Sequence, residues 1–186
     1  MGMGALHIGT DGGGSIRMPG GFTGIFGLKP SFGRVPAWPG SVFGTLGHIG
    51  PMTRTVGDAA LMLNVLSGPD ARDWTALPAT TRDYRVGLDD GVAGLRIAFS
   101  PALGHADVDP EIAALVRSAV DVLASLGAKV TEIDPGFDDP AETFRRQWFS
   151  AAAYMVSSFS PAKRRLLDPG LQDIAAQGAE ITMTEY

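Results

Sequence analysis

Residues 9–19 read Gly-Thr-Asp-Gly-Gly-Gly-Ser-Ile-Arg-Met-Pro, and this stretch decides how the rest of the chain is interpreted. The glycines at 12–14 can adopt backbone angles that other residues avoid, so their N–H groups can converge on one point. Ser15 adds a further N–H group and a hydroxyl beside that point. This layout is typical of a nucleophile with an oxyanion hole, but a flexible Gly-Ser loop has the same composition.

Three better-known glycine motifs each fail at a particular residue. A phosphate-binding loop has the spacing of Gly9 and Gly14, but it needs a lysine where Ser15 stands. A dinucleotide-binding fingerprint needs a third glycine where Arg17 stands. A nucleophile elbow needs a glycine two residues after Ser15, and that position is again Arg17.

The residues that flank this stretch predict how it is held. Residues 3–8 are mostly apolar and predict a short strand that leads into the glycine loop. Asp11 and Arg17 carry opposite charges on either side of Ser15. They could form an ion pair that clamps the loop, or they could be two exposed and unpaired charges.

Further along, the chain divides into four parts by composition. Residues 1–70 hold the glycine loop, and the first 57 residues contain 16 of the 25 glycines, which predicts a loop-rich segment. A helix is predicted over 58–66, with Thr55 as its N-cap and Gly68 with Pro69 after its end. Residues 71–93 form a predicted surface connection, 94–134 a strand–helix–strand unit, and 135–186 a helical segment.

The strand–helix–strand unit has the clearest local pattern. Residues 95–99 and 128–133 predict strands, and Asp109 with Pro110 predicts the start of the helix between them. Gly127 ends an apolar stripe at helical spacing, made of Ile112, Leu115, Val116, Ala119, Val122, Leu123 and Leu126. We expect a right-handed βαβ unit with parallel strands. A helix between two antiparallel edge strands is the alternative.

The last segment predicts helices that are interrupted at Pro161 and at Pro169-Gly170 and that still continue near Tyr186. Its apolar face would come from four aromatic residues, Phe144, Trp148, Tyr154 and Phe159.

Charge and composition exclude several classes of protein. The 186 residues include 15 basic and 20 acidic side chains, so the net charge of −5 argues against nucleic-acid binding. No apolar run approaches 18 residues, which argues against a membrane span. The absence of cysteine excludes disulfides, a thiol nucleophile and cysteine-ligated metals, and it fits a cytoplasmic protein. The three histidines, His7, His48 and His105, show no metal-ligand or triad spacing, and we expect each to be a packing or surface residue. We expect neither a metal nor a cofactor.

Four stretches together closely resemble the amidase signature family. Besides residues 9–19 they are Phe-Thr-Gly-Ile-Phe-Gly-Leu-Lys-Pro at 22–30, Gly-Arg-Val-Pro at 33–36, and Gly-Pro-Met-Thr-Arg-Thr-Val-Gly-Asp-Ala-Ala-Leu-Met-Leu at 50–63. The resemblance is dense over the first 70 residues and looser over the βαβ unit. It implies an α/β fold with a mixed sheet flanked by helices, of which this chain would be a part truncated at both ends.

The resemblance also implies a chemistry and a role for each residue of the loop. The family hydrolyses or transfers amides through a Ser–Ser–Lys triad, and Ser15 matches the acyl-forming nucleophile. The oxyanion-hole amides match Gly12, Gly13 and Gly14 together with Ser15, and the residues that order the site match Thr10, Asp11 and Arg17. The family's lysine and bridging serine precede this region and are absent from these residues, and Lys29 does not match that lysine.

Three interpretations of the function follow from the resemblance. We expect a stand-alone amidase that acts on a small-molecule amide, with these 186 residues inactive on their own. The alternatives are the amide-hydrolysing subunit of a tRNA-dependent amidotransferase and a non-catalytic remnant that serves as a binding or structural module. Thr23 stands where the family usually has a cysteine, and the chain lacks the longer C-terminal region of such a subunit, so we favour the amidase. Exposed apolar surface would lead to self-association or a homo-oligomer, to poor solubility or to a rearranged loop.

Overall fold

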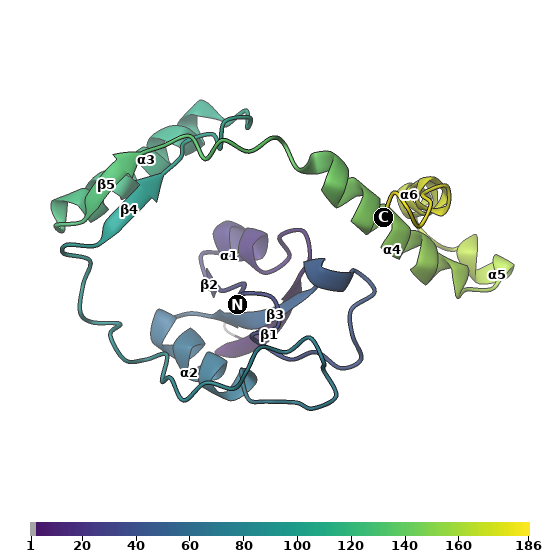
Figure 1. Ribbon diagram of the computed structural model, residues 1–186, viewed down its shortest axis with the longest axis horizontal. Coiled ribbons are helices and arrows are strands. Elements are labelled where there is room, and N and C mark those ends of the chain that lie inside the picture. The colour runs from purple at the N-terminus through teal and green to yellow at the C-terminus, as the bar shows by residue number, and fades with distance from the viewer. Residues whose placement is uncertain (1–2) are drawn as a thin grey trace. The chain divides into compact units, whose positions relative to one another are not determined.

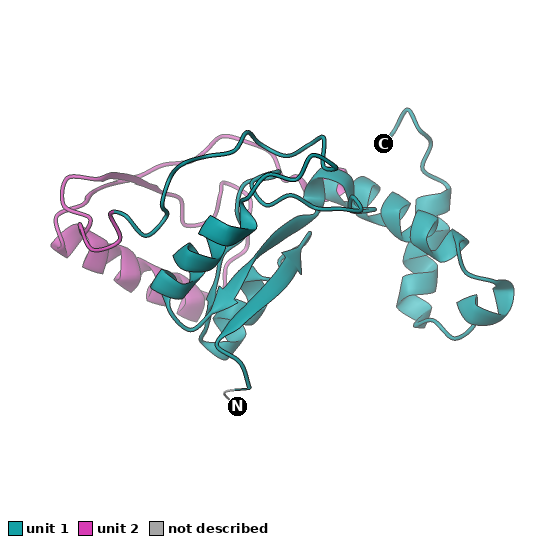
Figure 2. Ribbon diagram, turned by 90° about the horizontal axis from the view of Figure 1, so that it is seen from below, with its two compact units in different colours: residues 1–86, 144–186 teal, residues 87–143 magenta. Residues whose placement is uncertain are grey.

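The computed structural model describes residues 3–186, which form two compact units (Figure 2). The first unit combines the chain up to residue 86 with residues 144–186, and the second contains residues 87–143. The glycine loop therefore belongs to a unit that also includes the C-terminal helices.

A three-stranded antiparallel sheet forms the centre of the first unit (Figure 1). Its strands are β1 (Leu6–Asp11), β2 (Phe26–Gly27) and β3 (His48–Thr53), in the order β1-β3-β2. The register pairs Leu6 with Thr53 and Asp11 with His48. The predicted strand at 3–8 was therefore placed about three residues too early, because pairing with β3 sets the ends of β1.

The central strand β3 was not predicted from the sequence. It contains Gly50 and Pro51, a dipeptide that normally indicates a turn. A side chain at position 50 would overlap the carbonyl of Leu28, so glycine is needed there. Pro51 has no N–H to donate, but its carbonyl accepts a hydrogen bond from the Leu28 N–H at 3.0 Å. The expectation of a loop-rich N-terminal region was thus wrong for this segment.

Two helices and a short 3-10 turn complete the N-terminal part of the first unit. They are α1 (Arg17–Thr23), η1 (Gly44–Leu46) and α2 (Val56–Leu66). The Thr55 hydroxyl accepts a hydrogen bond from the Asp58 N–H at 3.1 Å, which confirms the predicted N-cap. Toward the sheet, α2 buries Ala59, Ala60 and Leu63.

The C-terminal part contains three helices. These are α4 (Ala141–Ser157), α5 (Pro161–Arg164) and α6 (Pro169–Ala179). Pro161 begins α5 and Pro169 begins α6, so these prolines start helices as well as interrupt them, as is common for proline in a first turn. The last helix ends at Ala179, so the expectation of helix near Tyr186 was wrong. The Thr182 N–H donates to the Glu185 carboxylate at 2.9 Å, a local contact that competes with helix formation.

The second unit confirms the predicted βαβ arrangement. It contains β4 (Arg96–Phe99), α3 (Pro110–Ser125) and β5 (Lys129–Glu132), and the two strands are parallel. The Asp109 carboxylate accepts a hydrogen bond from the Glu111 N–H at 2.8 Å, as expected of an N-cap before Pro110. The alternative with antiparallel edge strands was wrong.

The helix predicted from the spacing of apolar residues is confirmed as α3, but its apolar stripe is largely exposed. No residue of α3 is buried, and Leu115 is 61% exposed. Over residues 3–186, the antiparallel strands and the parallel strands lie in two separate sheets flanked by helices. The α/β fold class is therefore confirmed.

The crossing of α4 and α6, which lie side by side in Figure 1, depends on Gly178. In Gly178→Ala the new Cβ would overlap the carbonyl of Phe149, and overpacking of this kind costs about 1–3 kcal/mol. Gly21→Ala is the matched control, because Gly21 also lies in a helix and its added Cβ would have no atom within 4 Å. Thermal unfolding should show a lower Tm for Gly178→Ala only. Equal midpoints for both variants would contradict the close crossing.

Candidate active site

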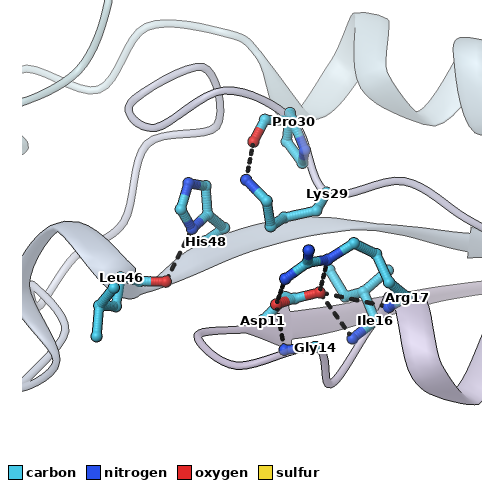
Figure 3. Close-up of polar contacts among 8 residues, drawn as sticks. All are labelled: Asp11, Gly14, Ile16, Arg17, Lys29, Pro30, Leu46 and His48. Carbon is cyan, nitrogen blue, oxygen red and sulfur yellow. Dashed lines mark hydrogen bonds and ion pairs between the residues drawn. The ribbon is translucent and has the colours of Figure 1, made fainter. Parts of the chain in front are cut away.

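The glycine loop begins where β1 ends, and the Asp11 carboxylate holds its backbone (Figure 3). Asp11 is buried, with only 1% of its surface exposed. Its Oδ1 accepts a hydrogen bond from the Gly14 N–H at 2.7 Å, and its Oδ2 accepts from the Ile16 N–H at 3.2 Å and the Arg17 N–H at 3.3 Å. The amides on both sides of Ser15 are therefore tied to one carboxylate.

Arg17 completes this arrangement as a bidentate ion pair. Its Nε lies 2.9 Å from Oδ2 of Asp11 and its Nη2 lies 2.9 Å from Oδ1. Of the two interpretations of these charges, the clamp is confirmed and the unpaired charges are wrong. The Asp11 side chain is fully covered, whereas the Arg17 side chain is 55% exposed. Water thus reaches one partner of the pair only.

The same contacts set the charge state of the pair. The Arg17 guanidinium holds the pKa of Asp11 well below its ordinary value, and three backbone N–H groups lower it further against the opposing effect of burial. Asp11 in turn raises the pKa of Arg17. The pKa of Asp11 is lower in the folded state than in the unfolded state, where it is about 3.9, so the ionised carboxylate stabilises the fold above that pH. This stabilisation is lost as the pH falls through the pKa of the folded state. The clamp is therefore charged at neutral pH.

Gly14 differs from its expected role. Its φ of +122° lies in a region that favours glycine, and an added Cβ would lie 2.9 Å from the Met18 side chain. This conformation turns its N–H toward the buried Asp11 carboxylate, which needs donors to offset its desolvation. Because that N–H is occupied, Gly14 does not supply an oxyanion donor in this structure, which corrects the sequence-based expectation.

The other amides of the loop remain available. Within residues 3–186, the N–H groups of Gly12, Gly13 and Ser15 donate no hydrogen bond to backbone or side chain, and the Ser15 hydroxyl has no partner. Ser15 itself is exposed. These three N–H groups and the Ser15 hydroxyl are therefore unoccupied donors on one turn.

Ser15 opens into a pocket of about 340 Å³ in the first unit. The sequence-predicted residues Thr10, Asp11 and Gly12 line it together with Ser15, whereas Gly13, Gly14 and Arg17 do not. The remaining lining residues come from three other segments and are Ala37, Pro39, Ser41, Val42, Phe43, Gly47, His48, Ile49 and Trp148. Sequence reasoning assigned none of these to the site.

His48 and Trp148 are the most informative of the residues that were missed. His48 was expected to be a packing or surface residue, and its Nδ1 lies 2.8 Å from the Leu46 carbonyl oxygen (Figure 3). Its ring also contacts the Phe32 ring edge-on, with centroids 5.8 Å apart. Trp148 comes from α4, far along the chain, and only the spacing of Phe144 and Trp148 on one helix face indicated an aromatic surface.

Other candidates lie away from the pocket lining. Lys29 donates to its neighbour's carbonyl, on Pro30, at 3.2 Å, and does not line the pocket with Ser15. In the described part of the chain, no three His, Cys, Asp or Glu side chains are grouped so that they could hold a metal ion. Among the helices of residues 3–186, none has the length and apolar character that a membrane crossing requires.

Two groups of curated relatives are similar to this chain. A glutamyl-tRNA(Gln) amidotransferase subunit of Ligilactobacillus salivarius is 46% identical over 127 residues, which are 68% of this chain and 26% of that protein. An acylamidase of Rhodococcus erythropolis is 40% identical over 144 residues, 76% of this chain and 30% of that protein. The chain thus spans less than a third of the length of these relatives.

Solved structures share the fold over nearly the whole chain. A bacterial aryl acylamidase of the amidase signature family superimposes with a TM-score of 0.83 at 33% identity, covering 97% of this chain and 40% of that one. The corresponding glutamyl-tRNA(Gln) amidotransferase subunit of Thermotoga maritima gives a TM-score of 0.66 at 26% identity, covering 96% and 40%. The family model described as Amidase matches residues 1–179. The chain therefore belongs to the amidase signature family.

Proposed function

We propose that the whole protein hydrolyses the C–N bond of a carboxamide with Ser15 as the nucleophile. The observation that carries this proposal is the clamp of Asp11 on the amides of Gly14 and Ile16. It fixes the backbone on both sides of Ser15, which is exposed and lines the pocket. A fixed nucleophile beside unoccupied N–H donors is what acyl transfer requires.

The reaction would proceed in two halves. Ser15 Oγ attacks the amide carbonyl, its proton passes to a base, and the N–H groups of Gly12, Gly13 and Ser15 stabilise the oxyanion of the tetrahedral intermediate. The C–N bond then breaks, the departing nitrogen takes up the proton, and an ester forms on Ser15. Water hydrolyses this ester and releases the carboxylic acid. One oxyanion donor contributes roughly 2.7–4 kcal/mol in such sites.

The base for Ser15 would come from outside residues 3–186. Within this range the Ser15 hydroxyl has no hydrogen-bond partner, and His48, which shares the pocket, forms no hydrogen bond with Ser15. The resemblance to the family points to a lysine relayed by a bridging serine. Thr10 and Arg17 would keep the loop ordered, and the expected cytoplasmic location stays a prediction.

The amidotransferase subunit is the second candidate, because several curated relatives of that kind are 36–46% identical to this chain. The sequence favours an amidase, because Thr23 stands where the family usually has a cysteine. Ammonia release from simple amides without tRNA or a partner protein would support the amidase. A requirement for partner subunits would support the alternative, and inactivity of the whole protein in both assays would support a binding module.

Ser15→Ala in the whole protein should abolish amide hydrolysis while the protein remains folded, because an exposed loop hydroxyl contributes little packing. The expected loss of kcat is on the order of 10⁴-fold or more. Steady-state kinetics with circular dichroism as the folding control provides the measurement. A Ser15→Ala variant with near wild-type kcat would show that another group is the nucleophile.

Asp11→Asn should lower kcat/KM by roughly 100-fold, because a carboxamide offers one acceptor oxygen and turns an NH2 group toward N–H donors. Asp70→Asn is a matched control, since Asp70 forms a similar contact with Arg72 at 2.6 Å but on the exposed surface. Exposed ion pairs of this kind contribute little. Comparable losses in both variants would argue that a general charge effect, rather than the clamp, is responsible.

The 186 residues alone should not hydrolyse amides, because an unassisted serine hydroxyl is a weak nucleophile at neutral pH. The test is a panel of amides together with labelling of Ser15 by a fluorophosphonate. Turnover that is lost in Ser15→Ala would instead place a base within these residues, and His48 would then be the first candidate.

A further inference from the structure

Aromatic rings from two distant segments form one wall of the pocket that contains Ser15. The rings of Phe43, just before η1, and Trp148, on α4, are stacked with centroids 4.3 Å apart and planes 25° apart. Phe144 stacks on Trp148 at 5.4 Å and 22°. Phe43 and Trp148 both line the pocket. The wall is therefore apolar, and stacking with Phe43 and Phe144 holds the Trp148 ring in place.

This aromatic wall lies directly on the turn that carries Ser15. A Cβ added at Gly12 would lie 3.1 Å from Trp148, and one added at Gly13 would lie 3.2 Å from Phe144. The amides of these two glycines are the ones that remain available for an oxyanion. A group bound next to the reacting carbonyl would consequently be in reach of Trp148.

Among residues 3–186, the pocket lining presents no unpaired charged side chain to a substrate. Asp11 is occupied by the Gly14, Ile16 and Arg17 donors, and His48 is held against the Leu46 carbonyl. The other lining side chains within residues 3–186 are uncharged, and the polar ones among them are hydroxyls of Thr10, Ser15 and Ser41. Binding an ammonium or carboxylate group there without a partner would carry a large desolvation cost.

We propose, on the basis of the assignment of Ser15 as the nucleophile, that Trp148 and Phe43 determine the substrate class. The pocket selects uncharged amides that carry an aromatic ring next to the reacting group, and it disfavours zwitterionic amino-acid amides such as glutamine. Edge-to-face packing of the substrate ring against this preformed aromatic wall supplies the selectivity. Trp148 is then a specificity-determining residue that acts through binding rather than through proton transfer.

Binding to the inactive whole protein tests this without relying on catalysis. Isothermal titration with benzamide should give a dissociation constant at least about tenfold higher for Ser15→Ala/Trp148→Ala than for Ser15→Ala. Tyr154→Ala in the same background is the matched control, because Tyr154 lies on the same helix and is 70% exposed. It should leave the affinity unchanged. Equal affinity in all three variants, or no benzamide binding, would overturn the proposal.

Kinetics of the active protein provide the second test. Wild type should have a kcat/KM for benzamide at least about 100-fold above that for L-glutamine, and Trp148→Ala should narrow this ratio mainly through KM. Trp148→Phe, which keeps an aromatic ring, should restore most of the ratio between the kcat/KM values for the two substrates. If Trp148 had only a structural role, Trp148→Ala would lower kcat/KM for both substrates equally. Preference for glutamine would overturn the proposal. If Ser15→Ala retained activity, the nucleophile assignment would fail, while the binding result for Trp148 would still stand.

Discussion

The Asp11 carboxylate is the contact on which the rest of the site depends. It is buried at the end of β1 and accepts hydrogen bonds from three backbone amides and two guanidinium nitrogens. A buried carboxylate without such donors would be strongly destabilising, so the loop folds around it to supply them. In doing so the loop fixes the backbone on both sides of Ser15 and commits the Gly14 N–H to structure. The N–H groups of Gly12, Gly13 and Ser15 keep no acceptor among residues 3–186.

A second constraint comes from packing across the first unit. The rings of Phe144 and Trp148 lie against the Cα positions of Gly13 and Gly12, where any side chain would crowd them. The glycines of the loop therefore serve two purposes: one adopts a φ that favours glycine, and the others admit the aromatic wall. This couples the C-terminal helices to the position of Ser15, and Gly178 extends the coupling to α6 through its close contact with Phe149.

Local signals in the sequence predicted the elements whose ends are set by local chemistry. Thr55 and Asp109 were identified as N-caps because their side chains satisfy the first amides of a helix, which needs no knowledge of the rest of the fold. The strand β3 could not be identified, because Gly50 and Pro51 resemble a turn and only the close approach of Leu28 explains them. The glycine loop was recognised from its motif, but Trp148 reaches the pocket through tertiary packing, which the sequence does not encode locally. The occupied N–H of Gly14 likewise depends on the orientation of one buried carboxylate.

Amide hydrogen exchange in the glycine loop, measured by NMR on the 186-residue chain at neutral pH, tests the central role of Asp11 most directly. The account predicts that the Gly14 and Ile16 amides exchange at least about tenfold more slowly than those of Gly12 and Gly13, because the former are bonded to a buried carboxylate. It also predicts that Asp11→Asn removes this difference. Exchange at Gly14 as fast as at Gly12 in the unmodified chain would contradict the account.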